Sequence, residues 1–572
     1  MNLDGFALPV KKLKGTDPVE TLDLSGKQLG VASAVVIASL ICANGGLTSL
    51  DLSHNALCNT FGGTYTAEGI TAIADALRVN GALTSVDLRG IWLGDEGWGA
   101  IFAAICGNKD SKIMSIDVSG ENIGPAGVKL IAEALRTSVT GALTSIQLKG
   151  NKLGDEGWGA IFAAICGNKD SEIMSLDASS ENIGPAGVKL IAEALRTSVT
   201  GVLTSIDLSS NHLTNYGDDM MGIKELAAAL GANDALTSLN LSGNQLCGVW
   251  TDYSGRHGTY TAEGITAIAD ALRVNGALTK LSLAWNKLEE EGNKAICEAL
   301  KQNKTLKELD LSGHTIGGEA GAKHVADMLG VNGALTSVDL RGNKLGDEGW
   351  GAIFAVICGN KDSKIISLDA ASENIGHAGV KLIAEAIRTS VTGALTVTNL
   401  LCNRLDAESA KMLAEVAKQK GISLCGIRRD QTTADFSKKN LEPPHAILLA
   451  SDLSQAVVTG ALTSLNLSSY KLCSVTETGY IKASQVQGSS FNEGDKVVYQ
   501  GKEMIVSEAK DSDGDIKMTN LPDMSGLNAL ADAFRVNGAL TELSIDGNHV
   551  GDKGVGAICE AIQSNKETKL VR

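Results

Sequence analysis

The sequence predicts an α/β solenoid of about sixteen strand–turn–helix units, and three observations lead to this fold class. First, the phrase L-x-x-L-x-L-x-x-N-x-L returns about every 28 to 30 residues. Second, a segment with the apolar spacing of an amphipathic helix lies between successive copies. Third, the 572-residue chain contains 65 Gly but only 7 Pro, which suits many short connections. Because each unit of such an array buries its apolar face against its neighbours, this length does not require several globular domains.

Each copy of the phrase predicts one short strand, centred on the middle Leu or its substitute. A clear copy consists of Leu47, Leu50, Leu52, Asn55 and Leu57. Parallel strands that are joined through a helix cross over right-handedly. The predicted strand centres are Leu22, Leu50, Val86, Ile116, Ile146, Leu176, Ile206, Leu239, Leu281, Leu309, Val338, Leu368, Thr398, Ala434, Leu465 and Leu543.

The segment GPAGVKLIAEAL, residues 124–135, shows why the rest of each unit is predicted as a helix. Val128, Ile131 and Leu135 lie on one helical face, and Pro125 falls where the first turn tolerates a missing N–H. Strands lie about 4.8 Å apart, whereas helices need about 10 Å. The array is therefore expected to curve into a horseshoe, with a parallel concave sheet and with helices on its convex face.

The Asn of the phrase offers hydrogen-bond donors and acceptors to the bend after each strand, and we expect these asparagines to be structural. In its length, phrase and helices, the chain resembles the ribonuclease-inhibitor-like subfamily of leucine-rich repeat proteins, over nearly the whole sequence outside one insertion. That subfamily includes inhibitors, innate-immune sensor arrays and activators of small GTPases. The resemblance therefore implies the fold and leaves the activity open.

The repeat falters at residues 422–444, and Pro443–Pro444 is expected to prevent a helix from starting in register there. We therefore predict a main array over residues 1–430 and a C-terminal array over 431–572. An insertion at about 474–521 interrupts the second array, and its apolar runs predict short strands. Its F-x-x-G-D-x-V-x-Y pattern is similar to small SH3- or Tudor-like barrels, which would place Phe491 and Tyr499 in a peptide groove. The alternative is a hairpin flap that covers the seam.

A super-repeat of two units is visible in the chain: residues 83–142 and 143–202 are nearly identical, and 335–394 is a third close copy. The first two copies differ mainly in the strand and the turn that follows it. Trp92 of the first copy, for example, corresponds to Lys152 of the second. Two explanations of this divergence are open: selection for a binding surface, or chance.

The composition argues against several classes of function. A formal net charge of −16 opposes the binding of nucleic acid through its phosphates. No apolar stretch reaches the roughly 18 to 20 residues of a membrane span, and the first residues lack the apolar core of a signal peptide. The 11 Cys form no C-x-x-C motif and are expected to be reduced packing thiols in a cytoplasmic protein.

No catalytic, metal or cofactor site is predicted. The His residues are scattered, and the phosphate-loop pattern G-x-x-x-x-G-K-[ST] is missing. GDEGWG, which begins at Gly94, Gly154 and Gly346, is interpreted as a turn whose acidic residues favour the following helix N-terminus. DSDGD at residues 511–515 lacks the Gly and the Glu that complete a calcium loop, so we expect a polar hairpin turn.

The first candidate surface for a protein partner is a column of acidic residues. The position between the second and third Leu of the phrase is expected to point into the concave groove. Like charges on adjacent strands are mildly destabilising, so the column suggests a groove that attracts a basic partner. The alternative is that each Asp is only hydrogen-bonded to neighbouring Ser and Thr. The candidates are Asp51, Asp87, Asp117, Asp177, Asp207, Asp310, Asp339 and Asp369.

The second surface is one rim of the array, because extra residues follow the same point of the repeat after Leu57, Leu246 and Leu472. Two of these loops carry aromatic residues in a chain with only 4% aromatics, a common form of contact site. Tyr65 and Tyr260 precede a duplicated helix and are expected to staple it. The candidates for contact are Phe61, Trp92, Trp250 and Tyr253. The third surface is the insertion, with Phe491 and Tyr499.

Together these features predict a non-enzymatic protein-interaction scaffold without a cofactor. The partner would bind through the acidic concave face, the aromatic rim loops and the inserted β module. One alternative is a regulator of a small GTPase, in which Arg89 or Arg341 would act on a transferring phosphate. Another is a structural subunit of a larger assembly. The sequence leaves the partner and the oligomeric state open.

Overall fold

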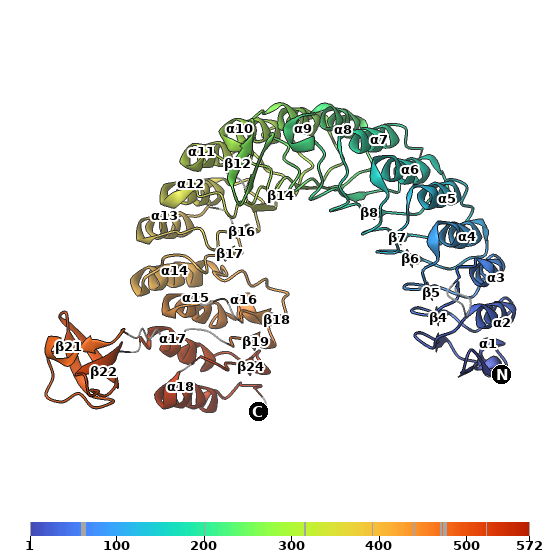
Figure 1. Ribbon diagram of the computed structural model, residues 1–572. Coiled ribbons are helices and arrows are strands. Elements are labelled where there is room, and N and C mark those ends of the chain that lie inside the picture. The colour runs from blue at the N-terminus through green and yellow to red at the C-terminus, as the bar shows by residue number, and fades with distance from the viewer. Residues whose placement is uncertain are drawn as a thin grey trace. The chain divides into compact units, whose positions relative to one another are not determined.

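The computed structural model describes residues 2–58, 64–199, 201–313, 316–391, 393–437, 439, 441–468, 472, 478–521, 523–548 and 550–570. Internal contacts divide the chain into two units, Met1–Ile316 and Gly317–Arg572. In both units short parallel strands alternate with helices (Figure 1). All sixteen predicted strand centres lie at the middle of a strand, so the predicted α/β repeat architecture is confirmed.

The first unit repeats the order strand, bend and helix. Its strands are β1 Asn2–Leu3, β2 Phe6–Ala7, β3 Thr21–Asp23, β4 Ser49–Asp51, β5 Ser85–Asp87, β6 Ser115–Asp117, β7 Ser145–Gln147, β8 Ser175–Asp177, β9 Ser205–Asp207, β10 Ser238–Asn240, β11 Val249–Asp252, β12 Gly255–Gly258, β13 Lys280–Ser282 and β14 Glu308–Asp310. Its α-helices are α1 Val10–Leu13, α2 Val31–Ile41, α3 Glu68–Leu77, α4 Gly94–Gly107, α5 Pro125–Arg136, α6 Gly154–Gly167, α7 Pro185–Arg196, α8 Met221–Ala232, α9 Glu263–Val274 and α10 Glu289–Leu300.

Consecutive repeats of the first unit pair in parallel and in register. Leu50 lies opposite both Leu22 and Val86, so the buried middle residues of the strands form a column. β3, β4 and β5 form one sheet, and β6 to β10, β13 and β14 pair in sequence order. Within this unit the strands line the inner side of the curve and the helices its outer side (Figure 1). We call the surface that the parallel strands of a unit form its strand face.

Asn55 shows how the phrase closes the bend after a strand. Its side-chain amide donates to the backbone oxygens of Leu24 and Leu52, both at 2.8 Å. Its Oδ1 accepts from the N–H groups of Lys27 and Leu29, both at 3.0 Å. One side chain thus pairs backbone groups of two consecutive repeats. The same pattern, which confirms the predicted structural role, recurs at Asn211 and Asn403.

A second asparagine ladder closes the other end of the unit, where a helix leads to the next strand. The Asn80 amide donates to Ile41 O at 2.8 Å, and its Oδ1 accepts from the N–H groups of Ala82 and Leu83 at 2.9 Å. This ladder is a structural feature that the sequence analysis missed. Further members are Asn44, Asn108, Asn168, Asn275, Asn303, Asn537 and Asn565.

The GDEGWG motif links one helix to the next. The motif forms the first turn of α4, with its acidic residues at the N-terminus as expected. Asp95 also accepts a hydrogen bond at 2.8 Å from the N–H of Gly124, the N-cap residue of α5. Each motif therefore caps the helix of the following repeat as well as its own. The equivalent residues in the other two copies are Asp155 and Asp347.

The second unit has the same alternation and carries the insertion. Its strands are β15 Ser337–Asp339, β16 Ser367–Asp369, β17 Val397–Asn399, β18 Thr433–Asp435, β19 Ser464–Asn466, β20 Ile481–Lys482, β21 Lys496–Tyr499, β22 Lys502–Glu508, β23 Asp515–Asn520 and β24 Glu542–Ser544. Its α-helices are α11 Gly318–Leu329, α12 Gly346–Gly359, α13 His377–Arg388, α14 Ala407–Lys420, α15 Pro443–Leu453, α16 Ala456–Thr459, α17 Ser525–Phe534 and α18 Gly551–Ser564.

Strand pairing in the second unit is interrupted after β17. β15, β16 and β17 pair in order, and β18, β19 and β24 form a separate parallel sheet. Between β17 and β18, Ser423 and Cys425 form isolated bridges to Val397 and Asn399. This short segment has no helix of its own before β18 begins. This interruption lies close to residue 430, whereas the division by internal contacts lies at Ile316–Gly317, so the two-array division at 430 stays a prediction.

The expectation that Pro443–Pro444 would prevent a helix from starting in register is wrong. α15 begins at Pro443, because the first helical turn requires no N–H donor from these residues. Glu442 is the N-cap, and its backbone N–H donates to Nδ1 of His445 at 3.1 Å. His445 is buried, and this burial lowers the pKa of its imidazole.

The insertion folds around a core of its own. β20, β23, β22 and β21 form an antiparallel sheet in that order. Phe491 and Tyr499 are partly buried against this core. The insertion is therefore a small β module, and the alternative of a hairpin flap is wrong. The core residues are Ala483, Val486, Val497, Met504, Val506, Ile516 and Met518.

Candidate partner-binding surface

Each Asp of the predicted acidic column is the last residue of its strand and holds the turn that follows. Asp207 Oδ1, for example, accepts the N–H of Ser209 at 2.8 Å. All eight candidates accept the N–H two residues further on, at 2.8 to 3.0 Å, and all are partly buried. Asn240, Asn399 and Asn466 make the same turn with an amide oxygen. The turn thus explains the oxygen acceptor, but it does not require the charge.

Basic residues neutralise part of this column. The Arg89 guanidinium lies 2.6 Å from Asp87 Oδ2 and 3.1 Å from Asp117 Oδ2. Arg341 bridges Asp339 and Asp369 in the same way, at 2.5 and 3.5 Å. These ion pairs engage both arginines that were considered as donors to a phosphate.

The ion pairs and the burial of the column shift the carboxyl pKa values in opposite directions. Burial would raise the pKa of Asp87, but hydrogen bonds from Arg89 outweigh it and lower the pKa. Burial dominates at Asp369 and raises the pKa of its carboxyl. The column is therefore not electrostatically uniform from strand to strand.

Three members of the column, Asp51, Asp207 and Asp310, form no ion pair within the described residues. Asp207 Oδ2 accepts from the Asn240 side chain at 2.9 Å, and Asp310 Oδ2 accepts from the Ser282 hydroxyl at 2.9 Å. Both donors are neutral. Asp207 and Asp310 thus place two carboxylates without an ion pair on the strand face from β9 to β14.

Trp285 adds an exposed aromatic ring to this same region. It follows β13, is 65% exposed and has a φ of 60°, in the left-handed region. Other repeats use Gly at the equivalent position, as at Gly243 and Gly313. A Cβ on Gly313 would lie 2.5 Å from the Trp285 ring, so the indole rests on that backbone. The sequence analysis missed Trp285, although a Trp at a Gly position of the repeat was a visible signal.

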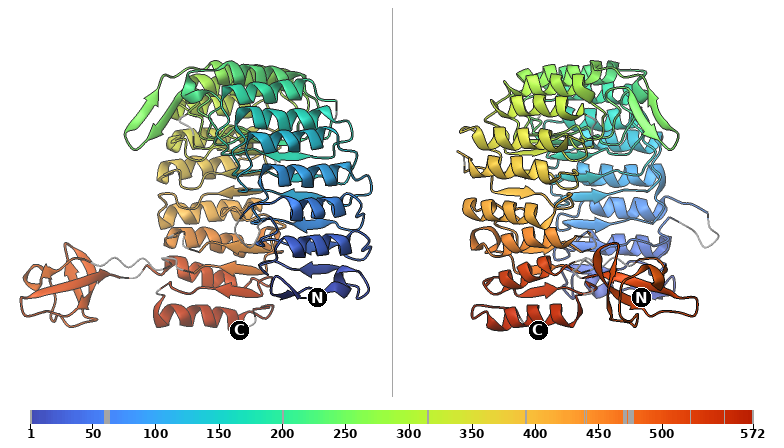
Figure 2. Two further views of the ribbon diagram at one scale, coloured as in Figure 1. Left: turned by 45° about the vertical axis from the view of Figure 1, so that its right-hand side comes forward. Right: turned by 90° about the vertical axis from the view of Figure 1, so that its left-hand side faces the viewer.

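The rim loop after Leu246 forms the β11–β12 hairpin, which projects from the first unit (Figure 2). It holds a row of aromatic rings: Tyr216 lies 4.9 Å from Trp250, and Trp250 stacks on His257 at 5.6 Å between ring centroids. His212 extends the row, 4.7 Å from Tyr216. Tyr253 at the tip is fully exposed. The structure therefore brings predicted Trp250 together with aromatic residues of neighbouring loops.

The tip of this hairpin also gathers Asp252, Ser254 and His257. The Ser254 hydroxyl and Asp252 Oδ1 both lie near Nε2 of His257, at 2.9 and 2.8 Å. A nucleophile relay needs the base and its orienting carboxylate on opposite ring nitrogens, so this arrangement is a turn and not a relay. Hydrogen bonds from Ser254 and His257 lower the pKa of Asp252 to about 2.

The other rim candidates have separate positions. Trp92 is 68% exposed after β5, and Phe61 lies outside the described residues. The Tyr65 and Tyr260 hydroxyls donate to Leu93 O at 2.7 Å and to Leu288 O at 2.8 Å, at the N-termini of α4 and α10, so each Tyr contacts the start of the next helix and not the helix that it precedes. The role of the exposed candidates in binding a partner stays a prediction.

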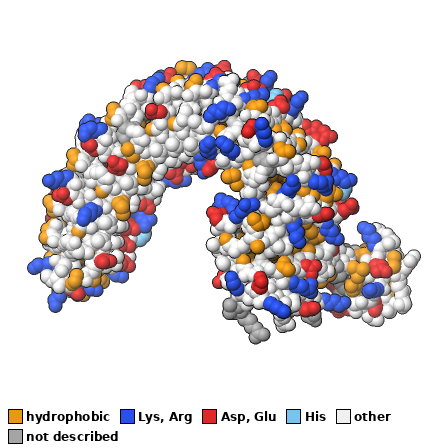
Figure 3. All heavy atoms as spheres, turned by 180° about the vertical axis from the view of Figure 1, so that it is seen from behind, with side chains coloured by type: hydrophobic (Ala, Val, Ile, Leu, Met, Phe, Trp, Pro, Cys, Tyr) orange, Lys and Arg blue, Asp and Glu red, His pale blue; other side chains and the backbone are white. Residues whose placement is uncertain are grey.

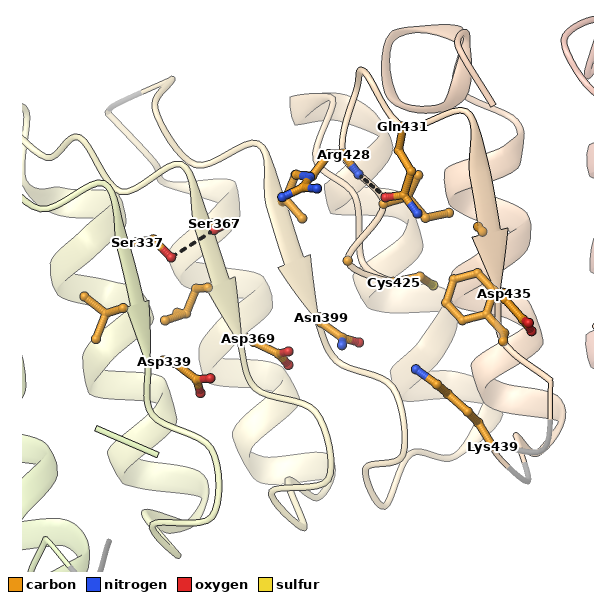
Figure 4. Close-up of a pocket in the computed structure, with 17 residues that line it drawn as sticks. Ser337, Asp339, Ser367, Asp369, Asn399, Cys425, Arg428, Gln431, Asp435 and Lys439 are labelled. Atoms are coloured by element: carbon orange, nitrogen blue, oxygen red, sulfur yellow. Dashed lines mark hydrogen bonds between the residues drawn. The ribbon is translucent and has the colours of Figure 1, made fainter. Parts of the chain in front are cut away.

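A groove of about 400 Å³ lies on the strand face of the second unit, where strand pairing is interrupted. Figure 4 shows Asp339, Asp369 and Asn399 along successive strands on one side of it. The segment from Cys425 to Arg428 forms one wall, and β18 with Phe436 and Lys439 forms the other. Two predicted aspartates thus border a hollow that the repeat pattern did not predict.

Two findings on the described residues concern metal ligands and membrane spans. They contain no group of three or more His, Cys, Asp or Glu side chains placed to hold a metal ion. DSDGD forms a polar turn, in which Asp511 Oδ1 accepts the N–H groups of Asp513 and Asp515 at 3.0 and 2.8 Å. Among the helices of this part of the chain, none combines the length and apolarity needed to cross a bilayer. Figure 3 shows acidic and basic side chains interspersed over the face in view.

Most cysteines of the described residues are buried free thiols. Burial raises the pKa of Cys106 and of Cys166 to about 11, and that of Cys247 to about 12. Such thiols remain protonated at neutral pH and act as small apolar side chains.

Several solved structures are similar to parts of this chain. The yeast Rad7–Elc1 complex includes a chain with 14% identity and a TM-score of 0.35, over 69% of this chain and 82% of that one. TLR13 in complex with ssRNA13 gives 15% identity and a TM-score of 0.34, over 76% and 51%. Leiomodin-1 actin-binding site 2 gives 24% identity and a TM-score of 0.23, over 29% and 85%. The search of curated proteins found no match.

A family model described as Leucine Rich repeat matches four segments of the chain, residues 143–162, 302–323, 334–354 and 539–559. Each segment includes a strand, the bend after it and the start or body of a helix of the repeat. The sixteen parallel strands repeat this unit in both parts of the chain. The chain therefore contains segments that match the leucine-rich repeat model, and it has the fold of an α/β solenoid.

Proposed function

We propose that this chain is a non-enzymatic scaffold that binds a protein partner through the strand face, the aromatic rim and the inserted β module. The observation that carries the proposal is the region from β9 to β14. There, Asp207 and Asp310 form no ion pair in the described residues, and Trp285, which follows the strand next to that of Asp310, exposes its indole. Exposed aromatic side chains on a rigid frame are the residues that most often supply binding energy.

Charge would direct the partner to this region. A formal net charge of −16 and the aspartates of the strand face attract basic surfaces and increase the rate of encounter. The stacked row of Tyr216, Trp250 and His257 would then contact the partner at the rim. The same negative charge opposes nucleic acid, and the buried free thiols fit a cytoplasmic location.

The test separates charge from the turn that each Asp also holds. The double variant Asp207→Asn/Asp310→Asn keeps the oxygen acceptor, because Asn240 already makes this turn with an amide. The control Asp75→Asn/Asp270→Asn removes the same charge from exposed positions on helices α3 and α9. Partners are captured from native extract with each protein and quantified at several salt concentrations.

We expect the strand-face variant to recover at least tenfold less partner than wild type and the control. This difference should be smaller at high salt. Trp285→Ala should reduce recovery at all salt concentrations, because the indole contributes apolar contact. Equal recovery by all variants would remove the strand face of the first unit from the proposed function.

A further inference from the structure

The groove between β17 and β18 has an open strand edge. Among the described residues β18 pairs only with β19. The N–H of Ser464 donates to Thr432 O at 3.1 Å, so Thr432 directs its carbonyl to β19. Alternate residues of a strand direct their backbone groups to opposite edges. The backbone groups of Thr433 and Asp435 therefore face the groove.

A side-chain amide occupies part of this edge. Gln431 Nε2 donates to Thr433 O at 2.7 Å, and its Oε1 accepts the N–H of Arg428 at 3.2 Å. An amide that accepts with its oxygen and donates with its nitrogen has the hydrogen-bonding groups of a peptide unit. The side-chain amide of Gln431 thus lies where the backbone of an additional strand would begin.

Two cations flank the groove at opposite ends. Arg428 lies where the strands begin, and Lys439 lies where they end (Figure 4). Both side chains are exposed, and neither forms an ion pair with a residue that the structure describes. Lys439 Nζ lies 5.8 Å from the centroid of the Phe436 ring. Between the cations, Cys425, Ile427 and Phe436 form buried walls.

Asp339, Asp369 and Asp435 line the groove, and Asp435 interacts electrostatically with Lys439. Arg341 bridges Asp339 and Asp369, so that pair already has a counter-charge. Burial also raises the pKa of the Asp369 carboxyl. Arg428 and Lys439 therefore offer positive charge to a ligand at the two ends of the groove, and Asp435 offsets part of it at the Lys439 end.

We propose that this groove binds an extended acidic segment of a protein partner. The segment adds to the open edge of β18 as a further strand, displaces the Gln431 amide and places carboxylates on Arg428 and Lys439. Pairing with a strand edge supplies backbone hydrogen bonds, while the flanking side chains select the sequence. The inference rests on the proposed scaffold function and adds a second partner chemistry to it.

A random 12-residue peptide library displayed on phage tests this proposal with the full chain. The library is selected in parallel on wild type, on Arg428→Glu/Lys439→Glu and on the control Lys129→Glu/Lys189→Glu. The control reverses two exposed charges on helices α5 and α7. Peptides enriched on wild type are then synthesised, and their affinities are measured by fluorescence anisotropy.

We expect wild type and control to enrich peptides rich in Asp and Glu, which bind the groove variant at least tenfold more weakly. Gln431→Ala should bind the same peptides more tightly, because no side chain competes for Thr433 O. Amide hydrogen exchange at Thr433 and Asp435 should slow when the peptide is bound. This exchange measurement separates strand addition from general attraction by charge.

Enrichment of basic or apolar peptides, or equal binding to wild type and the groove variant, would overturn the proposal. Concentration-dependent sedimentation of wild type that the groove variant loses would assign the edge to a second copy of this chain, and would also overturn it. The aspartates of the scaffold test lie outside this groove, in the first unit. A failure here therefore leaves the result of that test unchanged.

Discussion

Asp452 of α15 accepts a hydrogen bond at 2.7 Å from the hydroxyl of Ser423, in the segment that follows α14. The same carboxylate accepts the N–H groups of Leu424 and Cys425, at 2.8 and 3.0 Å. Asp452 is fully buried, and this burial raises the pKa of its carboxyl to about 6. One buried acid therefore fixes the wall of the groove to the helix layer beneath it.

Stability in this part of the chain should depend on the protonation of Asp452. In the unfolded chain its pKa is near the ordinary 3.8, so between about pH 4 and pH 6 only the folded state retains the proton. The free energy of unfolding therefore falls as pH rises through this window and levels off above about pH 6. The effect is on the order of 2 to 3 kcal/mol for a shift of this size.

Urea unfolding at pH 4, 5, 6 and 7 measures this slope in wild type and in Asp452→Asn. The variant retains an oxygen acceptor but no titratable group. Its free energy of unfolding should therefore fall less with rising pH, by the contribution of Asp452. Asp430→Asn, an exposed substitution in the same part of the chain, should follow wild type. Parallel profiles for wild type and Asp452→Asn would contradict the assignment.

The asparagine at the bend should be among the most sensitive positions of the array. Asn211 is 1% exposed and forms hydrogen bonds to Ala178 O, Leu208 O and the N–H groups of Glu181 and Ile183. Asn211→Ala leaves several buried backbone groups without a partner, at a cost of about 1 to 3 kcal/mol for each group that water does not reach.

We expect Asn211→Ala to lower the free energy of unfolding by about 2 to 4 kcal/mol, measured by urea titration. Hydrogen exchange should locate the loss in the repeats of β8 and β9, because each repeat contacts only its neighbours. Lys189→Ala, on the exposed face of α7, serves as the control and should change stability by less than about 0.5 kcal/mol. A loss below about 1 kcal/mol for Asn211→Ala would mean that water replaces the amide.

The column aspartates allow a direct comparison of turn and charge. Asp207→Asn should leave the free energy of unfolding within about 0.5 kcal/mol of wild type, since Asn240, Asn399 and Asn466 already hold this turn. Asp207→Ala removes the acceptor for the Ser209 N–H and should cost about 1 kcal/mol. If thermal unfolding shows equal losses for the two variants, the charge itself stabilises the fold.

The sequence predicted the strands accurately because their signal is local and repeated. Leu50, Leu52 and Asn55 mark places that recur along the chain, and each place has one physical requirement: burial for the leucines or their apolar substitutes, and backbone pairing for the asparagine. The column of aspartates followed from the same register. The second ladder, with Asn80, is also periodic, but it lies outside the phrase that predicts the strands.

The groove and the aromatic row could not be predicted in this way, because they depend on departures from the repeat. Gln431 meets the edge of β18 only because the segment before β18 lacks a helix. Tyr216 meets Trp250 because two loops of different length project together. The prediction from Pro443–Pro444 was wrong because proline disrupts the interior of a helix but fits its first turn.

Two glycines of the super-repeat should differ sharply when each is replaced by alanine. A Cβ on Gly187 would lie 2.6 Å from Asp155 Oδ1, the atom that caps Gly184 at 2.7 Å, so Gly187→Ala must displace the cap. We expect the free energy of unfolding to fall by about 1 to 3 kcal/mol.

Gly167, the last residue of α6, has no neighbouring atom within 4 Å of the place where a Cβ would lie. Gly167→Ala should therefore be neutral or up to about 1 kcal/mol stabilising. Urea unfolding of both variants checks the pair, and equal effects would show that Asp155 does not link α6 to α7.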